Sequence, residues 1–556
     1  MSVDLIIHRA RIFTGRPGAD GPEPDADTLA IRAGRIVAVG READVRRGVG
    51  RADEVIDAAG GLVTAGFFDA HAHVVQGGHE RIGCDLTDCA TAQATVAEVR
   101  AHAAALPDDA WVVGGGWSMD HFPGGRPDID LLSAAVGGRP AFLVNRDHHG
   151  AWVSRAALAA AGVDATTPDP AGGTIDRRPD GTPSGTLQES AMDLVRHVLP
   201  AVTVADVVAA IGAAQDYLHS LGVIGWQEAI VGDYAGFPDS TDGYRAALAD
   251  GVLNARVNGA LWLPRTLTPD TLEDVVADLI ERRRRFGDQQ VTGERAASLR
   301  APSVKIMVDG VVESHTAALR EPYADLDSVG PSHFEPGVLR LAAARLAAAG
   351  FQLHFHAIGD RALAESLDAI EAAREAGDDG AMRHHVAHLQ IVDRADLPRM
   401  AALGVTANLQ ALWAANSAQM LGLNRPLLGE RRYLTCQYPF ASMRRAGVRL
   451  AMGSDWPVSS PDPWQAIHVA VNRREPERPE DEPLSIEEAL DLAACVRAYT
   501  AGSASLNLQH DIGVVAPGRT ADLAVADRDP FAAPAEETWQ VRNRLTLVAG
   551  RVVAGR

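Results

Sequence analysis

Apolar and polar residues alternate in short runs at both ends of the chain. This alternation, broken by glycine turns, occurs in residues 3–65 and again in residues 512–556, and each part contains an Ala-Gly-Arg turn. Period-two alternation between turns is typical of antiparallel strands. We therefore predict one β domain built from both ends, residues 1–65 and 506–556, with a larger domain, residues 66–505, inserted between them.

From about residue 201 the pattern becomes a regular alternation of two kinds of segment. Stretches rich in alanine and leucine, such as 203–220 and 270–286, are spaced as helices, and short apolar runs separate them. About eight such repeats predict a parallel sheet that closes into a (β/α)8 barrel. The apolar runs are residues 222–230, 255–263, 303–309, 351–358, 384–390, 404–410 and 448–455.

Residues 75–200 lack this regularity and are dense in glycine, proline and aspartate. Such a composition is typical of loops and turns. We interpret the region as a subdomain inserted after the first barrel strand, over the mouth of the barrel. Trp117 and His149 are candidates for lining a substrate pocket there, although loop packing and turn chemistry are the commoner roles for any one such residue.

Charge and composition narrow the class of protein. The formal net charge of -21 disfavours nucleic acid and anionic membranes as partners. The N-terminal residues contain no secretory signal pattern, and no apolar stretch is long enough to span a bilayer. Four cysteines are too few for a disulfide framework in 556 residues. We therefore expect a cytoplasmic protein with reduced thiols that acts on a small molecule.

Functional residues of (β/α)8 barrels lie at the carboxyl ends of the strands. His71 and His73 follow the apolar run 62–68 and point to one side, since strand side chains alternate. Asp69, on the same side, is placed to fix their tautomers. A single histidine is usually a packed residue, but joint occurrence on separate strands indicates a metal site. The polar residues of the later runs are Lys305, His356, His388 and Asp455.

Lys305 is the only lysine among 52 basic residues, so the other 51 (52 − 1) are arginine. A surface lysine can become arginine at little cost. A lysine that must lose its proton and react cannot, because guanidinium stays charged. Burial in an apolar run lowers the pKa of a lysine and frees its amine. The alternative is that Lys305 remained a lysine by chance, with its aliphatic chain packed on the core and its ammonium group in water.

Nitrogen and oxygen ligands without thiolate suit a borderline divalent metal, with zinc expected first and nickel, manganese or iron as alternatives. Four histidines, an aspartate and a bridging group can hold one or two ions. Two ions roughly 3.5–4 Å apart can share a hydroxide near neutral pH. An anionic bridge offsets their charge, and Lys305 carboxylated by CO2 to a carbamate supplies such a bridge.

Motifs along almost the whole chain resemble the amidohydrolase superfamily, and within it the YtcJ-like branch that includes N-substituted formamide deformylases. The resemblance implies a distorted TIM barrel with a discontinuous β-sandwich domain. The matching motifs are GFFDAHAHV (66–74), GGGW (114–117), Asp147 with His149, GGxI (172–175), VKIMVDG (304–310), TAAL (316–319), PY (322–323), HFHAIGDRA (354–362), RHHVAHLQ (383–390), GER (429–431), GSDWPV (453–458) and PGRTADLAV (517–525).

The resemblance also implies six metal ligands, divided between two ions. The more buried ion is held by His71, His73 and Asp455, the outer ion by His356 and His388, and carboxylated Lys305 bridges them.

A catalytic role for Asp455 follows from the same resemblance. Asp455 would take the proton of the attacking hydroxide and pass it to the leaving nitrogen, as general acid–base chemistry requires. Residues close to the motifs are candidates for contacts to the substrate. They are Asp309, Arg320, Tyr323, Gln410 and Trp413.

The chain departs from the family pattern near the outer ion. The family usually reads RxxEHAQ around His388, whereas this chain has Ala387 in place of the glutamate and Leu389 in place of the alanine. Ala411 stands where a proline often follows Gln410. The missing carboxylate leaves a one-metal site as an alternative to two ions.

We therefore expect a hydrolase of a non-peptide C–N bond, most directly of an acyclic amide such as an N-substituted formamide, through attack by a metal-activated hydroxide. The alternatives are a cyclic amide, a carbamate or an ester at the same metal site, and a barrel that has lost catalysis and serves as a scaffold. Retention of all six ligand positions disfavours the scaffold. The sequence leaves the substrate and the oligomeric state open, with a homodimer as the default.

Overall fold

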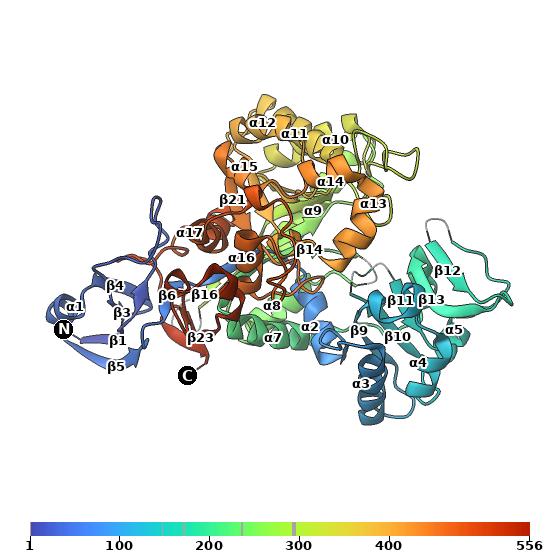
Figure 1. Ribbon diagram of the computed structural model, residues 1–556, viewed down its shortest axis with the longest axis horizontal. Coiled ribbons are helices and arrows are strands. Elements are labelled where there is room, and N and C mark those ends of the chain that lie inside the picture. Colours follow the sequence, from blue (N-terminus) through green and yellow to red (C-terminus); the bar gives the residue numbers. More distant parts are fainter. Residues whose placement is uncertain are drawn as a thin grey trace.

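The protein has three parts arranged in a row (Figure 1). The barrel lies in the middle, sheets made by both ends of the chain lie on the left, and an inserted part with its own sheet lies on the right. The computed structural model describes residues 2–146, 148, 150–170, 173–234, 237–291 and 296–555.

Eight parallel strands form the barrel sheet. Between its first and last strands the ring is closed by a hydrogen bond of 2.7 Å from Asp455 N to His71 O. The predicted barrel is thereby confirmed in a distorted form. In spatial order the strands are β7 (Phe67–Ala72), β14 (Val223–Val231), β15 (Arg256–Trp262), β17 (Ala297–Met307), β18 (Gln352–Ala357), β19 (His385–His388), β20 (Thr406–Leu409) and β21 (Arg449–Met452), with β16 (Asp288–Val291) antiparallel to β17.

Helices surround the barrel strands. The first long one, α7, begins where the Thr203 side chain accepts from Asp206 N and the Asp206 carboxylate accepts from Thr203 N, a capping box. The close approach of α2 to α7 requires glycine, because a Cβ on Gly78 would lie 2.1 Å from Ala210 O. These helices are α2 (Val74–Ile82), α7 (Val204–Ser220), α8 (Thr241–Ala249), α9 (Leu272–Phe286), α10 (Pro336–Ala348), α11 (Asp360–Glu375), α12 (Leu397–Ala402), α13 (Arg425–Leu428), α14 (Glu430–Cys436), α15 (Phe440–Arg445), α16 (Pro463–Asn472), α17 (Leu492–Arg497) and α18 (Ser503–Leu506).

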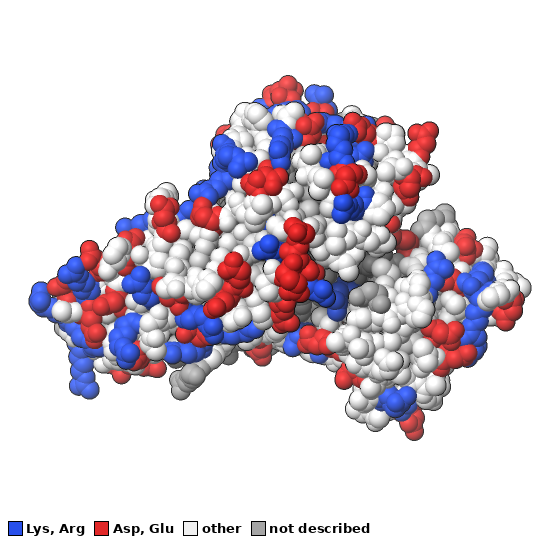
Figure 2. Space-filling view, in the orientation of Figure 1, with Lys and Arg blue, Asp and Glu red and all other residues white. Residues whose placement is uncertain are grey.

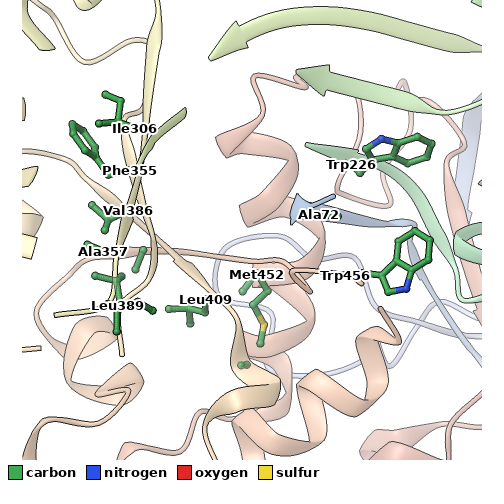
Figure 3. Packing of buried hydrophobic residues seen from close by; sticks show 14 of the residues in the cluster. Ala72, Trp226, Ile306, Phe355, Ala357, Val386, Leu389, Leu409, Met452 and Trp456 are labelled. Carbon is green, nitrogen blue, oxygen red and sulfur yellow. The ribbon is translucent and has the colours of Figure 1, made fainter. Parts of the chain in front are cut away.

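Alternation along the strands separates the apolar core from the polar centre. Ile306, Phe355 and Val386 are paired in register on β17, β18 and β19, and all three are fully buried (Figure 3). Lys305 and His356 have the opposite parity, so they lie on the other face of the same strands. One face of each strand therefore packs against the helices while the other lines the barrel interior.

Strands from both ends of the chain pair with one another. In the five-stranded sheet Ala65 of β6 pairs with Leu523 of β22. The two Ala-Gly-Arg turns lie against each other, so closely that a Cβ on Gly34 would be 2.8 Å from Ala549 O. The domain limits at residues 65 and 506 stay predictions. The sheets contain β1 (Ser2–His8), β3 (Thr28–Arg32), β4 (Arg35–Gly40) and β5 (Arg51–Asp57), with α1 (Glu42–Val49), and β2 (Arg11–Ile12), β6 (Leu62–Ala65), β22 (Leu523–Ala526), β23 (Asn543–Val548) and β24 (Arg551–Ala554).

The insert is an ordered sheet with helices and its own apolar core, although its sequence is rich in turn residues. Glycine is needed inside its strands, because a Cβ on Gly114 would lie 2.2 Å from Cys84 O. The elements are β8 (Cys84–Asp85), β9 (Val112–Trp117), β10 (Ala141–Asn145), β11 (Gly150–Val153), β12 (Gly173–Arg177) and β13 (Pro183–Glu189), with α3 (Ala92–Ala105), α4 (Ile129–Ala135), α5 (Arg155–Ala161) and α6 (Asp193–Arg196).

The surface carries both signs of charge. Figure 2 shows acidic and basic side chains interspersed over the visible face, without a continuous patch of either sign. Among the described helices, none is both long and apolar enough to cross a bilayer.

Candidate metal centre

The barrel brings the six predicted ligands together at the carboxyl ends of its strands. His71 and His73 come from the end of β7, where the chain enters α2, and Asp455 follows β21. All six are buried except His73, which is partly buried. The remaining three are Lys305 on β17, His356 on β18 and His388 on β19.

The carboxylate of Asp455 lies among three of the imidazoles. Its Oδ1 is 3.3 Å from His71 Nε2 and 3.2 Å from His73 Nε2, and its Oδ2 is 4.0 Å from His388 Nδ1. Potential ligand atoms of His71, His388 and Asp455 all lie within 4.8 Å of one another. Burial alone would raise the pKa of Asp455, but hydrogen bonds from His71 and His73 hold it well below its usual value.

Lys305 is buried beside these ligands, with 2% of its surface exposed. Its Nζ lies 3.4 Å from His71 Nε2. Burial lowers the pKa of Lys305 to about 7, against the opposing effect of the Asp455 charge. A large share of the amine is therefore unprotonated near neutral pH, which is the form that can react with CO2.

Asp309 holds His356 in position. Its carboxylate is fully buried, with Oδ1 3.2 Å from His356 Nδ1. It also accepts backbone N–H bonds from Ala318, Ile358 and Gly359 at 2.9, 3.0 and 2.8 Å. A carboxylate behind a ligating histidine fixes its tautomer and orientation. This corrects the expectation that Asp309 contacts the substrate, because its oxygens are occupied by the protein.

His388 reaches the centre through an unusual backbone conformation. Strand alternation places Ala387, not His388, on the inner face, but φ is 75° at His388 and 53° at Leu389. Gln410 stabilises this turn, since its Oε1 accepts from His388 N at 2.7 Å. Gln410 is 1% exposed and its amide donates to Asn408 Oδ1. It therefore positions His388, which corrects its assignment as a substrate contact.

Two further histidines lie behind His71, and the sequence interpretation missed both. His354 Nε2 is 3.0 Å from His71 Nδ1, and the rings of His354 and His385 are 4.2 Å apart. Both histidines are fully buried. The signal was present in the sequence, since His354 and His356 repeat the i, i+2 spacing of His71 and His73.

Asp69 acts on the backbone and not on the imidazole rings. Its Oδ1 accepts from His71 N at 3.0 Å and from Ser454 N at 2.9 Å. Its Oδ2 accepts from Ser454 Oγ. Asp69 thus fastens β7 to the segment after β21, and the contact to the His71 ring comes from His354 instead, which corrects the predicted role of Asp69.

The side chains of two predicted substrate contacts are engaged by other parts of the protein. Trp117 is 1% exposed, donates its indole N–H to Leu143 O at 2.8 Å and packs in the core of the insert. The Arg320 guanidinium pairs with Asp393 and Asp396. These placements correct the assignments of Trp117 and Arg320.

Tyr323 is likewise not directed at the centre, because it is 4% exposed and its hydroxyl donates to Ala317 O at 3.0 Å. Trp413 is partly buried, and its indole nitrogen has no hydrogen-bond partner among the described residues. Its assignment as a substrate contact stays a prediction. His149 lies outside the described residues.

The donor set fits a divalent metal ion. His388 Nε2 is buried and has no hydrogen-bond partner in the described part of the chain. Burial, followed by the Lys305 charge, lowers the pKa of His71 to about 3, so this imidazole is neutral, the form that binds metals. Nitrogen and oxygen donors without thiolate suit zinc and its borderline neighbours.

Two relatives align with almost the whole chain. YtcJ of Bacillus subtilis (strain 168) is 27% identical over 507 residues, which cover 90% of each chain. N-substituted formamide deformylase of Arthrobacter pascens is 28% identical over 559 residues, which cover 98% of this chain and 97% of the deformylase.

Solved structures share the fold. An uncharacterized metal-dependent hydrolase from Pyrococcus horikoshii OT3 superimposes with a TM-score of 0.72 at 23% identity, covering 96% of this chain and 99% of that one. Residues 54–554 match the sequence model of the amidohydrolase family. Because this match spans most of the chain, the protein belongs to the amidohydrolase family.

Proposed function

We propose that this metal-dependent hydrolase cleaves a non-peptide C–N bond, with an acyclic amide such as an N-substituted formamide as its substrate. The observation that carries the proposal is the buried Lys305 amine, 3.4 Å from His71 Nε2 within a group of histidines and Asp455. The full-length similarity to N-substituted formamide deformylase supports an amide as the class of substrate.

The ligands on the protein would hold zinc, one ion or two. A bound ion would supply a water of lowered pKa and would polarise the substrate carbonyl. The residues that would hold it are His71, His73 and Asp455 at one position, His356 and His388 at the other, and Lys305 as its carbamate between them.

Lys305 contributes by forming the carbamate. Its unprotonated amine adds to CO2, one proton is released, and the neutral amine becomes an anionic carbamate. Arginine has no equivalent reaction, because its guanidinium does not lose its proton at accessible pH. The pKa of about 7 that burial gives Lys305 makes the amine available for this step.

Asp455 moves the proton. In the metal-free protein its pKa is well below the usual value, because hydrogen bonds from two histidines outweigh the effect of burial, so it is ionised. It accepts a proton from the attacking water and returns it to the leaving nitrogen, so that amide and water give a carboxylic acid and an amine. Asp309 and Gln410 keep His356 and His388 in place throughout.

A panel of substrates tests the proposal. Enzyme supplied with zinc and bicarbonate is assayed with N-benzylformamide, δ-valerolactam, phenyl acetate and a phenyl carbamate. We expect release of formate from N-benzylformamide, lost in Asp455→Asn and kept in the control Asp53→Asn, an exposed position in β5. Turnover of phenyl acetate alone would refute an amide substrate. Metal content below about one ion per chain, not restored by zinc and bicarbonate, would favour a scaffold.

A further inference from the structure

A second cluster of side chains lies beside Lys305 at the same end of the barrel. Trp262, the last residue of β15, pairs in register with Lys305, and Met307 follows Lys305 by two residues on β17. In-register residues on parallel strands share one face of the sheet, as do residues two apart on one strand. Trp262 and Met307 therefore lie on the face of the sheet that carries Lys305.

The loop after β14 adds an aromatic ring to this cluster. The ring centroid of Tyr234 lies 4.7 Å from that of Trp262, and Tyr234 Oη lies 3.8 Å from Met307 Sδ. Burial raises the pKa of Tyr234, and the charges that act on it are, in decreasing order, those of Arg265, Glu189, Arg196 and Asp455. The ring is thus within electrostatic reach of the catalytic carboxylate and of an arginine.

Arg265 lies at the outer side of the cluster, where its side chain is exposed. Its Nη2 is 2.7 Å from Met307 Sδ, and its guanidinium carbon is 5.7 Å from the centroid of Trp262. None of the described carboxylates forms an ion pair with it. A thioether and an indole do not neutralise a guanidinium, so its charge is available to a ligand.

Arg265 is also close to the outer side of the metal centre. Met307, which contacts Arg265, pairs in register with His356, and His333 Nδ1 lies 3.1 Å from Met307 O. Burial lowers the pKa of His333 to about 4, and the charges of Arg265 and His356 both contribute to this lowering. The Arg265 guanidinium and the candidate ligand His356 are therefore both neighbours of Met307 on β17.

We propose that Arg265, Trp262 and Tyr234 form a subsite for an acidic amide, with Arg265 binding a carboxylate and the two rings packing on the apolar or planar body of the substrate. The proposal rests on the proposed function and adds the class of substrate to it. A guanidinium presents a fixed fork that pairs with both oxygens of a carboxylate. Aromatic rings contribute apolar area with defined geometry.

Two amides that differ only in the carboxylate test the subsite. They are N-formylphenylalanine and N-phenethylformamide, each assayed for kcat/KM with the metal-loaded enzyme. We expect the acid to be preferred by about tenfold or more, since a charge-assisted pair of hydrogen bonds is lost with the neutral amide. In Arg265→Gln the preference should disappear through loss of activity on the acid alone.

Arg51→Gln is the matched control, because Arg51 is exposed at the start of β5 in the sheets of the chain ends. It should keep the wild-type preference. Equal kcat/KM for both amides in the wild type would overturn the subsite. An equal fall for both amides in Arg265→Gln would overturn it as well.

A binding measurement separates the subsite from the proposed function. N-formylphenylalanine is titrated calorimetrically into wild type and Arg265→Gln, whether or not it is hydrolysed. Binding that weakens about tenfold or more in the variant supports the subsite even if no amide is turned over, in which case only the proposed function fails. Undetectable binding to the wild type, or equal binding to both proteins, refutes the subsite.

Two variants of Tyr234 test the contribution of its ring to the subsite. Tyr234→Phe keeps the ring and should retain kcat/KM for N-formylphenylalanine. Tyr234→Ala removes the ring and should lower kcat/KM for N-formylphenylalanine several-fold. It should lower kcat/KM for N-formylglycine, which has no side-chain ring, much less. Equal effects of Tyr234→Ala on the two formylated amino acids would count against packing of the substrate on this ring.

Discussion

His354 Nε2 lies 3.0 Å from His71 Nδ1, so the imidazole of a candidate metal ligand is oriented by a second imidazole. For His71 Nε2 to bind a metal, its Nδ1 must carry the proton and donate it to His354. His354 then accepts through Nε2 and keeps its own proton on Nδ1. Carboxylates and backbone carbonyls are the usual acceptors behind a ligating histidine. Here a buried, neutral histidine takes that place.

We predict that His354→Leu weakens metal binding about 10- to 100-fold, because His71 loses the acceptor that fixes its tautomer. His354→Gln should retain most of the affinity, since its side-chain oxygen can accept the same bond. Competition between the metal-free protein and a chromogenic chelator for zinc measures both affinities. Equal affinities of wild type and His354→Leu would contradict a positioning role for His354.

Lys305→Arg should abolish activity, although arginine supplies every other basic side chain of the protein. Lys305→Ala should lose most activity, and short carboxylic acids such as acetate should partly restore it by standing in for the carbamate. Initial rates with and without added acid, at constant zinc, measure the effect. Full activity of Lys305→Arg would rule out the carbamate.

Asp309→Ala should destabilise the protein by about 3 kcal/mol or more, because three buried backbone N–H groups and His356 lose their acceptor. Asp309→Asn keeps an oxygen acceptor and should destabilise the protein less than Asp309→Ala does. It should still lower metal content, because the amide orients His356 less firmly. Thermal unfolding and metal analysis separate these effects. A rise in KM at unchanged metal content would instead support the earlier assignment of Asp309 as a substrate contact.

His219 gives the fold a dependence on pH that is independent of the metal centre. It is 2% exposed, and burial lowers its pKa from 6.5 to about 4. Below pH 6.5 the His219 imidazole is protonated in the unfolded chain but not in the folded protein. The free energy of unfolding is therefore highest above pH 6.5 and falls as the pH drops towards 4. At pH 5 the loss is roughly 2 kcal/mol.

The decrease in unfolding temperature between pH 7 and pH 5 should therefore be smaller in His219→Gln than in the wild type. Differential scanning fluorimetry of both proteins at the two pH values provides the comparison. Parallel decreases in the two proteins would show that His219 does not contribute.

The barrel was predictable because its strands and helices obey local rules. The predicted helices 203–220 and 270–286 correspond to α7 and α9 within two residues. The structure of the insert was harder to predict from the sequence, because its glycines allow strands to approach closely and do not only form turns. Gly114 illustrates this, since the carbonyl that excludes its Cβ belongs to Cys84, thirty residues earlier.

Within the candidate centre, the candidate ligands could be proposed from their positions at strand ends, whereas the roles of their neighbours depend on tertiary contacts. Asp309 and Gln410 were assigned to the substrate, since a sequence does not tell whether a polar group faces a ligand or a neighbouring strand. His354 was overlooked because its partner lies on β7, far away along the chain.

The pairing of Ala65 with Leu523 has a consequence for the order of folding during synthesis. One residue, Gly66, separates β6 from β7, and the first two candidate ligands, His71 and His73, lie at the end of β7 and directly after it. Its sheet partner β22 leaves the ribosome only after every barrel strand has been made. While the barrel strands are being synthesised, β6 therefore lacks its pairing with β22. The segment that carries His71 and His73 gains this neighbouring sheet contact only late in biosynthesis.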